Sequence, residues 1–345
     1  MNPLIGKKES SSSVLFLALP VIIFSYLSKS LLGFNSGSWI NFGLCFSLAF
    51  LLLFLIRNSF KDTGENKVLI KITELIFFLY VSSLSLSNYT LSVSSLASVC
   101  GNSGLNEEYI SFFIIIISLI CALCGIEGIT RFSFVAFGIF SLILIVMCLV
   151  SFKGWDYENI APLLGNNIRS TFLDLRGVKV FAPVMCLWFL KSKFRNRSEA
   201  FKSSKQSIIR IFFLGFLTIF VCILSIPYPM GSLYTFSLEG IFSIAKSGAF
   251  FHRFEIILVL AVSLVSLVCT SIGIYLSSSS LSRLTNSGDS KAFCIVYAFL
   301  FFILNINFGL DKPYEMTTDA LSAILYILLL IASIKNTFHA KRVKS

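Results

Sequence analysis

The sequence has little charge and almost no histidine. Only 13% of its 345 residues are Asp, Glu, Lys or Arg, and its two histidines are His252 and His339. Hydrophobic residues make up 56% of the chain, which leaves too little polar sequence to cover a soluble domain. The sequence also shows no nucleophile beside a general base, so an enzyme is the least favoured class and no cofactor is expected.

Two short motifs carry no functional prediction. The nine cysteines lie mostly within apolar stretches, where cysteine behaves as a small apolar residue. Cys121 and Cys124 form a Cys-x-x-Cys pair, but no histidine or carboxylate cluster accompanies it, so we expect no metal site and no redox centre. Asn88-Tyr89-Thr90 fits a glycosylation sequon, which we interpret as a chance match.

Long apolar stretches are what the sequence does contain. Each is close to the roughly 20 residues that a helix needs to cross a bilayer. They cover residues 14–32, 39–56, 72–95, 109–125, 132–151, 172–190, 208–226, 254–276, 292–308 and 317–334. The pattern predicts an all-α integral membrane protein with ten transmembrane helices. We expect a single polytopic domain over 1–345, with an N-terminal segment 1–13, a bundle 14–334 and a tail 335–345.

The basic residues orient this bundle. Of the 28 lysines and arginines, 20 lie in or at the edges of every second gap between the apolar stretches, six lie in or at the edges of the other gaps, and Arg176 and Lys179 lie inside the sixth stretch. The positive-inside rule then places both termini in the cytoplasm. The net charge of +11 is therefore a sign of membrane topology, and we expect the lipid bilayer, not nucleic acid, to be its counterpart.

The first and sixth stretches are interrupted. The first contains Pro20, and the sixth combines ionisable groups with helix-breaking residues: Asp174, Arg176, Gly177, Lys179 and Pro183. Ionisable groups are costly in hydrocarbon and normally face a cavity or a partner. The two stretches hold matching places in two halves of five that run in opposite directions. Such a pattern predicts a five-plus-five inverted repeat with broken helices 1 and 6. The alternative is that Pro20 only kinks its helix and the charges pair with one another.

A ligand site is predicted where these two interruptions meet. Half-helix ends expose backbone donors that favour a carboxylate, and unwound carbonyls that favour an ammonium group. The predicted ligand-binding residues are Ala18, Leu19, Pro20, Tyr80, Phe172, Asp174, Arg176, Gly177 and Lys179.

Three further segments carry a resemblance to a known family. Residues 124–131 read CGIEGITR, residues 151–165 read SFKGWDYENIAPLLG, and residues 248–255 read GAFFHRFE. Together they resemble the spore germination permease family, the B subunits of nutrient germinant receptors in endospore-forming bacteria. That family shares a Gly-x-x-x-x-x-Arg start of span five, an Asp-x-x-Asn external loop and an acidic-basic start of span eight. Each motif also has a structural interpretation, such as a Glu127–Arg131 pair one helical turn apart.

The resemblance implies a fold and a function. The family belongs to the amino acid–polyamine–organocation superfamily, whose fold is a five-plus-five inverted repeat. The implied function is that of a receptor subunit in the spore inner membrane that binds a small germinant such as an amino acid. It would signal to an A-type membrane subunit and a C-type lipoprotein.

Two other functions stay open at this point. A secondary amino acid transporter would use the same site with full alternating access, and fold alone does not separate it from a receptor. A glycan flippase or polymerase is less favoured, because no external loop is rich in Arg and His.

Overall fold

The chain is all-helical throughout the part that the structure describes. The structure is a computed structural model and describes residues 6–20, 22, 37–60, 67–100, 106–152, 155–160, 175–194, 197–225, 255–287, 290–308 and 313–342. Within these ranges the α-helices are α1 (Lys7–Pro20), α2 (Ser38–Leu55), α3 (Lys67–Cys100), α4 (Glu107–Leu123), α5 (Gly125–Ser151), α7 (Cys186–Phe189), α8 (Arg197–Ser225), α10 (Glu255–Leu284), α11 (Ser290–Phe308) and α12 (Pro313–Arg342). Short 3-10 segments are η2 (Arg57–Phe60), η5 (Tyr157–Ile160), η6 (Leu175–Met185) and η7 (Leu190–Lys193).

Several of these helices are built for a membrane. Five are long and apolar enough to span one: Ser38–Leu55, Val68–Ala97, Gly125–Val146, Ser198–Ser225 and Val259–Leu284. Their outward faces are apolar as well; Leu149 on α5 and Phe213 on α8 are among the most exposed large side chains. A bundle with an apolar outer surface and all backbone groups paired within helices suits hydrocarbon. The protein is therefore a multi-pass membrane protein.

Each of the ten predicted stretches overlaps a helical segment of the described chain. Their use as ten spans in an inverted repeat stays a prediction. The start of the bundle differs from the expectation, because α1 begins at Lys7 and not at residue 14. The serines at positions 10–13 are buried inside the bundle, where we had expected an N-terminal segment outside it.

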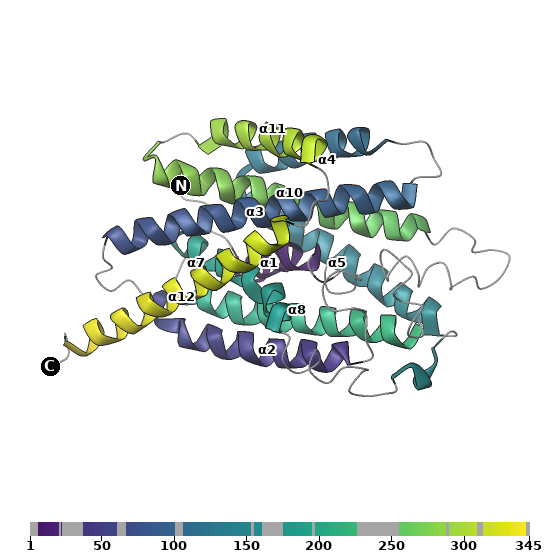
Figure 1. Cartoon of the computed structure of the whole chain (residues 1–345), viewed down its shortest axis with the longest axis horizontal. Helices are drawn as coiled ribbons and strands as arrows, with labels where there is room; N and C mark the ends of the chain where they lie inside the picture. The colour runs from purple at the N-terminus through teal and green to yellow at the C-terminus, as the bar shows by residue number, and fades with distance from the viewer. Residues whose placement is uncertain are drawn as a thin grey trace.

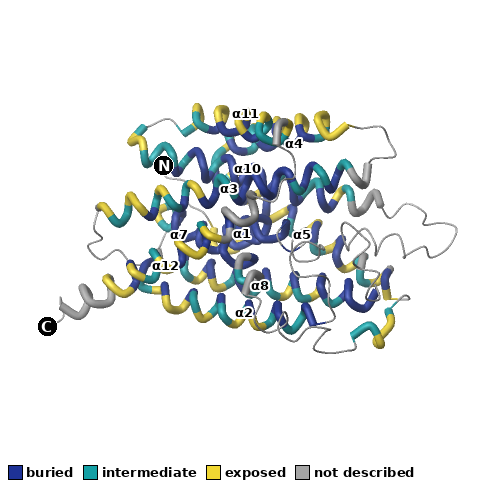
Figure 2. Tube along the Cα trace, viewed as in Figure 1, coloured by how far each residue is buried: buried dark blue, intermediate teal, exposed yellow. Residues whose placement is uncertain are grey.

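Helix α1 occupies the centre of the bundle. It contacts α3, α5, α8, α10 and η6, and Figure 2 shows it buried between the outer helices. Its apolar residues Leu15, Phe16 and Leu17 are fully buried, and Phe16 packs edge-on against Phe140 of α5 with ring centroids 6.3 Å apart. A helix buried on every side is the natural place for a site that several helices share.

The long helices α3 and α10 form the most extensive helix pair and run side by side across the bundle (Figure 1). They come very close at Gly273 of α10, where an added Cβ would lie 2.1 Å from Oγ and 2.4 Å from Cβ of Ser85. A glycine at this crossing lets the two backbones approach, as small residues do between membrane helices.

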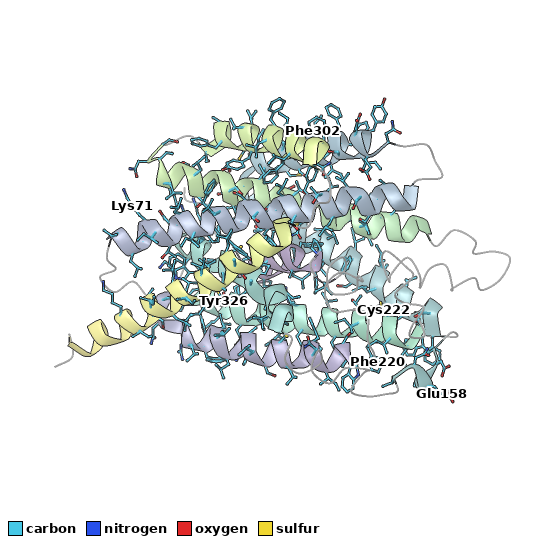
Figure 3. All side chains as sticks on the ribbon, viewed as in Figure 1. Lys71, Glu158, Phe220, Cys222, Phe302 and Tyr326 are labelled. Carbon is cyan, nitrogen blue, oxygen red and sulfur yellow. The ribbon has the colours of Figure 1, made fainter. Side chains whose placement is uncertain are left out.

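The basic ends of the elements gather at one end of the bundle. Arg57 of η2 lies over Phe201 of α8, the Lys191 ammonium donates to the Ser59 carbonyl, and Ser280 of α10 donates to the Glu74 carbonyl near the start of α3. In Figure 3 Lys71 lies toward this end and Glu158 at the opposite end. We call it the basic end. The location of these basic residues at one end agrees with the alternation of charge along the sequence. That this end faces the cytoplasm stays a prediction.

Candidate functional site

The structure places the predicted site residues of α1 in the bundle core. Ala18, Leu19 and Pro20 are buried at the described end of α1, and Tyr80 is buried on α3. Proline has no backbone N–H, so position 20 gives no donor to the carbonyl one turn earlier. Because α1 contacts both α3 and η6, it lies between the elements that the sequence predicted to form the site.

The sixth predicted stretch is irregular where it is described. Residues Leu175–Met185 form an 11-residue 3-10 segment, η6, that contains Pro183. A run of 3-10 helix this long is uncommon and frequently marks a hinge or strain. The backbone at Arg176, Gly177 and Lys179 belongs to this segment, whereas Phe172 and Asp174 lie outside the described residues. The structure therefore puts η6 against α1, and the role of these side chains stays a prediction.

Asn88 of α3 joins three helices at the predicted site. Its side-chain amide is buried and donates to the Leu17 carbonyl of α1 at 3.3 Å, and it lies 3.3 Å from the Cys269 sulfur of α10. A buried amide that donates to a backbone carbonyl near a helix end contributes about 0.5–1.5 kcal/mol. Asn88 is thus the polar link that fixes the end of α1 to α3 and α10.

Buried hydroxyls lie near Asn88 and Cys269 along α3 and α10. Ser85 and Ser92 lie on the same face of α3 as Asn88, and Thr270 follows Cys269 on α10. All three hydroxyls are buried and have no hydrogen-bond partner among the described residues. An unpaired buried hydroxyl is unfavourable, so a group of them beside an amide suits a polar ligand or ordered water.

The prediction from sequence missed this polar cluster. Asn88 appeared only as part of a chance sequon, and its burial with Tyr89 and Thr90 places that sequon in the core. The missed signal is spacing, because Ser85, Asn88 and Ser92 recur three and four residues apart within an apolar helix.

Several contacts hold the basic end together where the sixth predicted stretch, 172–190, comes to its end. We call this stretch segment six. The Trp188 indole donates to the Ser59 carbonyl at 3.0 Å, and the Arg283 guanidinium donates to the Phe189 carbonyl at 3.2 Å. The Phe189 ring also stacks on Phe77 of α3 with centroids 3.3 Å apart. These contacts fix the end of segment six to η2, α3 and α10.

Serines of α1 form further hydrogen bonds at the basic end, with residues of α5 and α8. The Ser10 and Ser203 hydroxyls are 2.8 Å apart, and those of Ser13 and Ser133 are 2.7 Å apart. The Arg210 guanidinium of α8 donates to the hydroxyls of Ser11 at 2.7 Å and of Ser12 at 3.0 Å. The serine run that the sequence placed ahead of the bundle therefore binds α1 to α5 and α8.

The motif residues that lie in the described chain act structurally. Glu127 and Arg131 form the expected ion pair one turn apart on α5. The Asp156 backbone N–H donates to the Leu224 carbonyl at 3.0 Å, and the Asn159 side chain donates to the same carbonyl at 3.2 Å. This Asp-x-x-Asn motif thus satisfies a carbonyl at the C-terminal end of α8. In the third motif only Glu255, the first residue of α10, is described.

A comparison with protein families identifies the family of this chain. The sequence model of a family described as spore germination protein matches residues 67–311, which is more than half of the chain. The matched region covers α3 with Asn88, segment six and α10 with Cys269 and Thr270. A search of curated proteins found no match.

Proposed function

The chain belongs to the spore germination protein family, and on that premise we propose that it is the membrane subunit of a nutrient germinant receptor. It would bind a small germinant, an amino acid being the best fit, and signal to an A-type membrane subunit and a C-type lipoprotein. The family is one of membrane permeases and receptors, which agrees with the expectation that this protein is not an enzyme. We propose the spore inner membrane as its location, with both termini cytoplasmic.

The observation that carries the proposal is the Asn88 link. Asn88 holds the Leu17 carbonyl of α1 and contacts Cys269 of α10, beside the buried hydroxyls of Ser92 and Thr270. A germinant with both a carboxylate and an ammonium group would find hydroxyl and backbone donors and carbonyl acceptors here. The predicted groups of segment six, Asp174 and Arg176 among them, would complete the site from the other side.

Signalling requires two states that the ligand distinguishes. A germinant shifts the equilibrium only if it binds one arrangement of α1, η6 and α10 better than the other. The basic end is tied by hydrogen bonds from a charged donor to neutral hydroxyls, such as those between Arg210 and the serines of α1, each of which contributes about 1.5–3 kcal/mol. We propose that germinant binding at the Asn88 link changes how tightly α1 is held at the basic end, and that partner subunits respond to this change.

Germination of spores with altered genes tests the proposal. Deleting the gene should slow or abolish the response to one class of nutrient and leave uptake by vegetative cells unchanged. In the complemented strain, Asn88→Ala should raise the half-maximal germinant concentration roughly five- to tenfold, the factor that losing one buried hydrogen bond gives. Lys202→Ala, an exposed residue of α8, is the matched control and should respond as the wild type does.

The transporter hypothesis predicts a different outcome. Saturable uptake by the purified protein alone in liposomes, together with normal germination of the deletion strain, would favour a transporter over a receptor subunit. Immunoblots of spore membranes for the Asn88→Ala protein separate a loss of signalling from a loss of protein.

A further inference from the structure

Two cations stand over aromatic rings where α2 and α8 meet at the basic end. The Arg57 guanidinium lies 5.6 Å from the Phe201 ring centroid. The Lys205 ammonium lies 5.9 Å from the centroids of both Phe50 and Phe54. The rings of Phe54 and Phe201 are themselves in contact, with centroids 6.0 Å apart, so these five residues form one group. We call it the α2–α8 cation cluster.

The charge of the cluster is not neutralised by a carboxylate of the residues that the structure describes. Arg57 and Lys205 are both exposed, and neither forms an ion pair with a carboxylate among the residues that the structure describes. Exposed Lys202, on the preceding turn of α8, adds a third cation without such a pair. Cation–π contact restrains where the charged groups lie but leaves their charge available to an outside anion.

An apolar strip leads directly to the cluster. Along α2, Leu51 is 55% exposed and Leu55 is 53% exposed, and Phe54 lies between them on the same exposed side. In a membrane protein such a strip contacts lipid chains. The strip ends two residues before Arg57, so a surface for an acyl chain and a site for an anionic headgroup follow each other along α2 and η2.

We propose that the α2–α8 cation cluster binds the headgroup of an anionic phospholipid. The headgroup phosphate would lie between Arg57 and Lys205, and an acyl chain would lie along Leu51, Phe54 and Leu55. Basic residues at the edge of a membrane segment attract anionic lipids in general. Here the rings hold two of these cations at one place, which makes the cluster a site and not only a region of positive charge. The proposal depends on the membrane location alone and is independent of the germinant.

Lipid binding by the purified full-length protein tests this site. The protein would be measured in detergent with added phosphatidylglycerol or phosphatidylcholine, by native mass spectrometry and by thermal unfolding. Phosphatidylglycerol should bind and raise the Tm of the wild type more than phosphatidylcholine does. The Arg57→Gln/Lys205→Gln variant should bind phosphatidylglycerol more weakly, by roughly fivefold for each cation lost. Lys205→Arg should retain binding.

The control removes a cation elsewhere at the same end. Lys291→Gln changes an exposed lysine at the start of α11, a helix on the opposite side of the bundle from α2 (Figure 1). Its phosphatidylglycerol affinity should equal that of the wild type. Equal losses in Lys291→Gln and Lys205→Gln would show general surface attraction and would overturn the proposal. A double variant that keeps its phosphatidylglycerol affinity would also overturn the proposal. This includes the case in which the double variant keeps that affinity but no longer binds an acidic segment of a partner subunit.

Discussion

A methyl group at position 273 should push α3 and α10 apart. The Cβ of an alanine there would lie 2.4 Å from the Ser85 Cβ, which is fixed directly to the α3 backbone and has no torsion that moves it away. Restoring an ordinary contact of 3.4 Å requires a separation of about 1 Å between two closely packed helices. The Ser85 hydroxyl could rotate away, but the Ser85 Cβ could not.

The magnitude follows from two opposing effects. Overpacking a core position costs about 1–3 kcal/mol, whereas replacing glycine by alanine within a helix gains up to about 1 kcal/mol. We therefore expect Gly273→Ala to reduce the free energy of unfolding by about 1–2 kcal/mol. Replacing Ser85 by glycine should remove the clash, since the nearest remaining atom is the Ser85 Cα at 3.5 Å. The double variant should thus be more stable than Gly273→Ala alone, with a coupling energy of about 1–2 kcal/mol.

Thermal unfolding in detergent, followed with a thiol-reactive dye, measures this effect. Cys186, Cys222 and Cys269 are buried thiols that become reactive only when the bundle opens. The matched control is Gly138→Ala on α5, where an added Cβ meets nothing within 4 Å, so its Tm should stay unchanged or rise. The packing argument would be refuted if Gly273→Ala behaved like Gly138→Ala, or if Ser85→Gly did not restore the Tm of Gly273→Ala.

Two further measurements test the basic end and the orientation. Trp188→Phe removes the indole donor to the Ser59 carbonyl and should lower the stability by about 1 kcal/mol in the same unfolding assay. Trp39→Phe, which removes a buried indole N–H that has no partner among the described residues, should not lower it comparably, and equal effects would contradict a role for the Ser59 bond. Exposed single cysteines at positions 192 and 158 should react with an impermeant reagent from opposite sides of the membrane; reaction of both from one side would contradict the topology inferred from charge.

The sequence alone determined the class of protein. Apolar length and the alternation of basic gaps are one-dimensional properties, since a helix must be about as long as the bilayer is thick and its basic flanks stay on one side. They predicted helical segments in the right places and the common location of Arg57, Lys191 and Arg283 at one end. The motifs at 124–131, 151–165 and 248–255 likewise predicted the family that the comparison found, because they are local patterns.

Tertiary structure decided which polar groups meet. Whether Asn88 reaches Leu17 depends on how α3 crosses α1, and the close crossing of α3 and α10 depends on Ser85 facing Gly273 across 188 positions of sequence. The serine run at 10–13 looked like an exposed approach to the membrane, since serine is polar. The opposing hydroxyls of Ser133 and Ser203 and the Arg210 guanidinium give it partners inside the bundle. Hydropathy places each segment in the membrane, but which polar groups of different helices pair with one another is a property of the packed bundle.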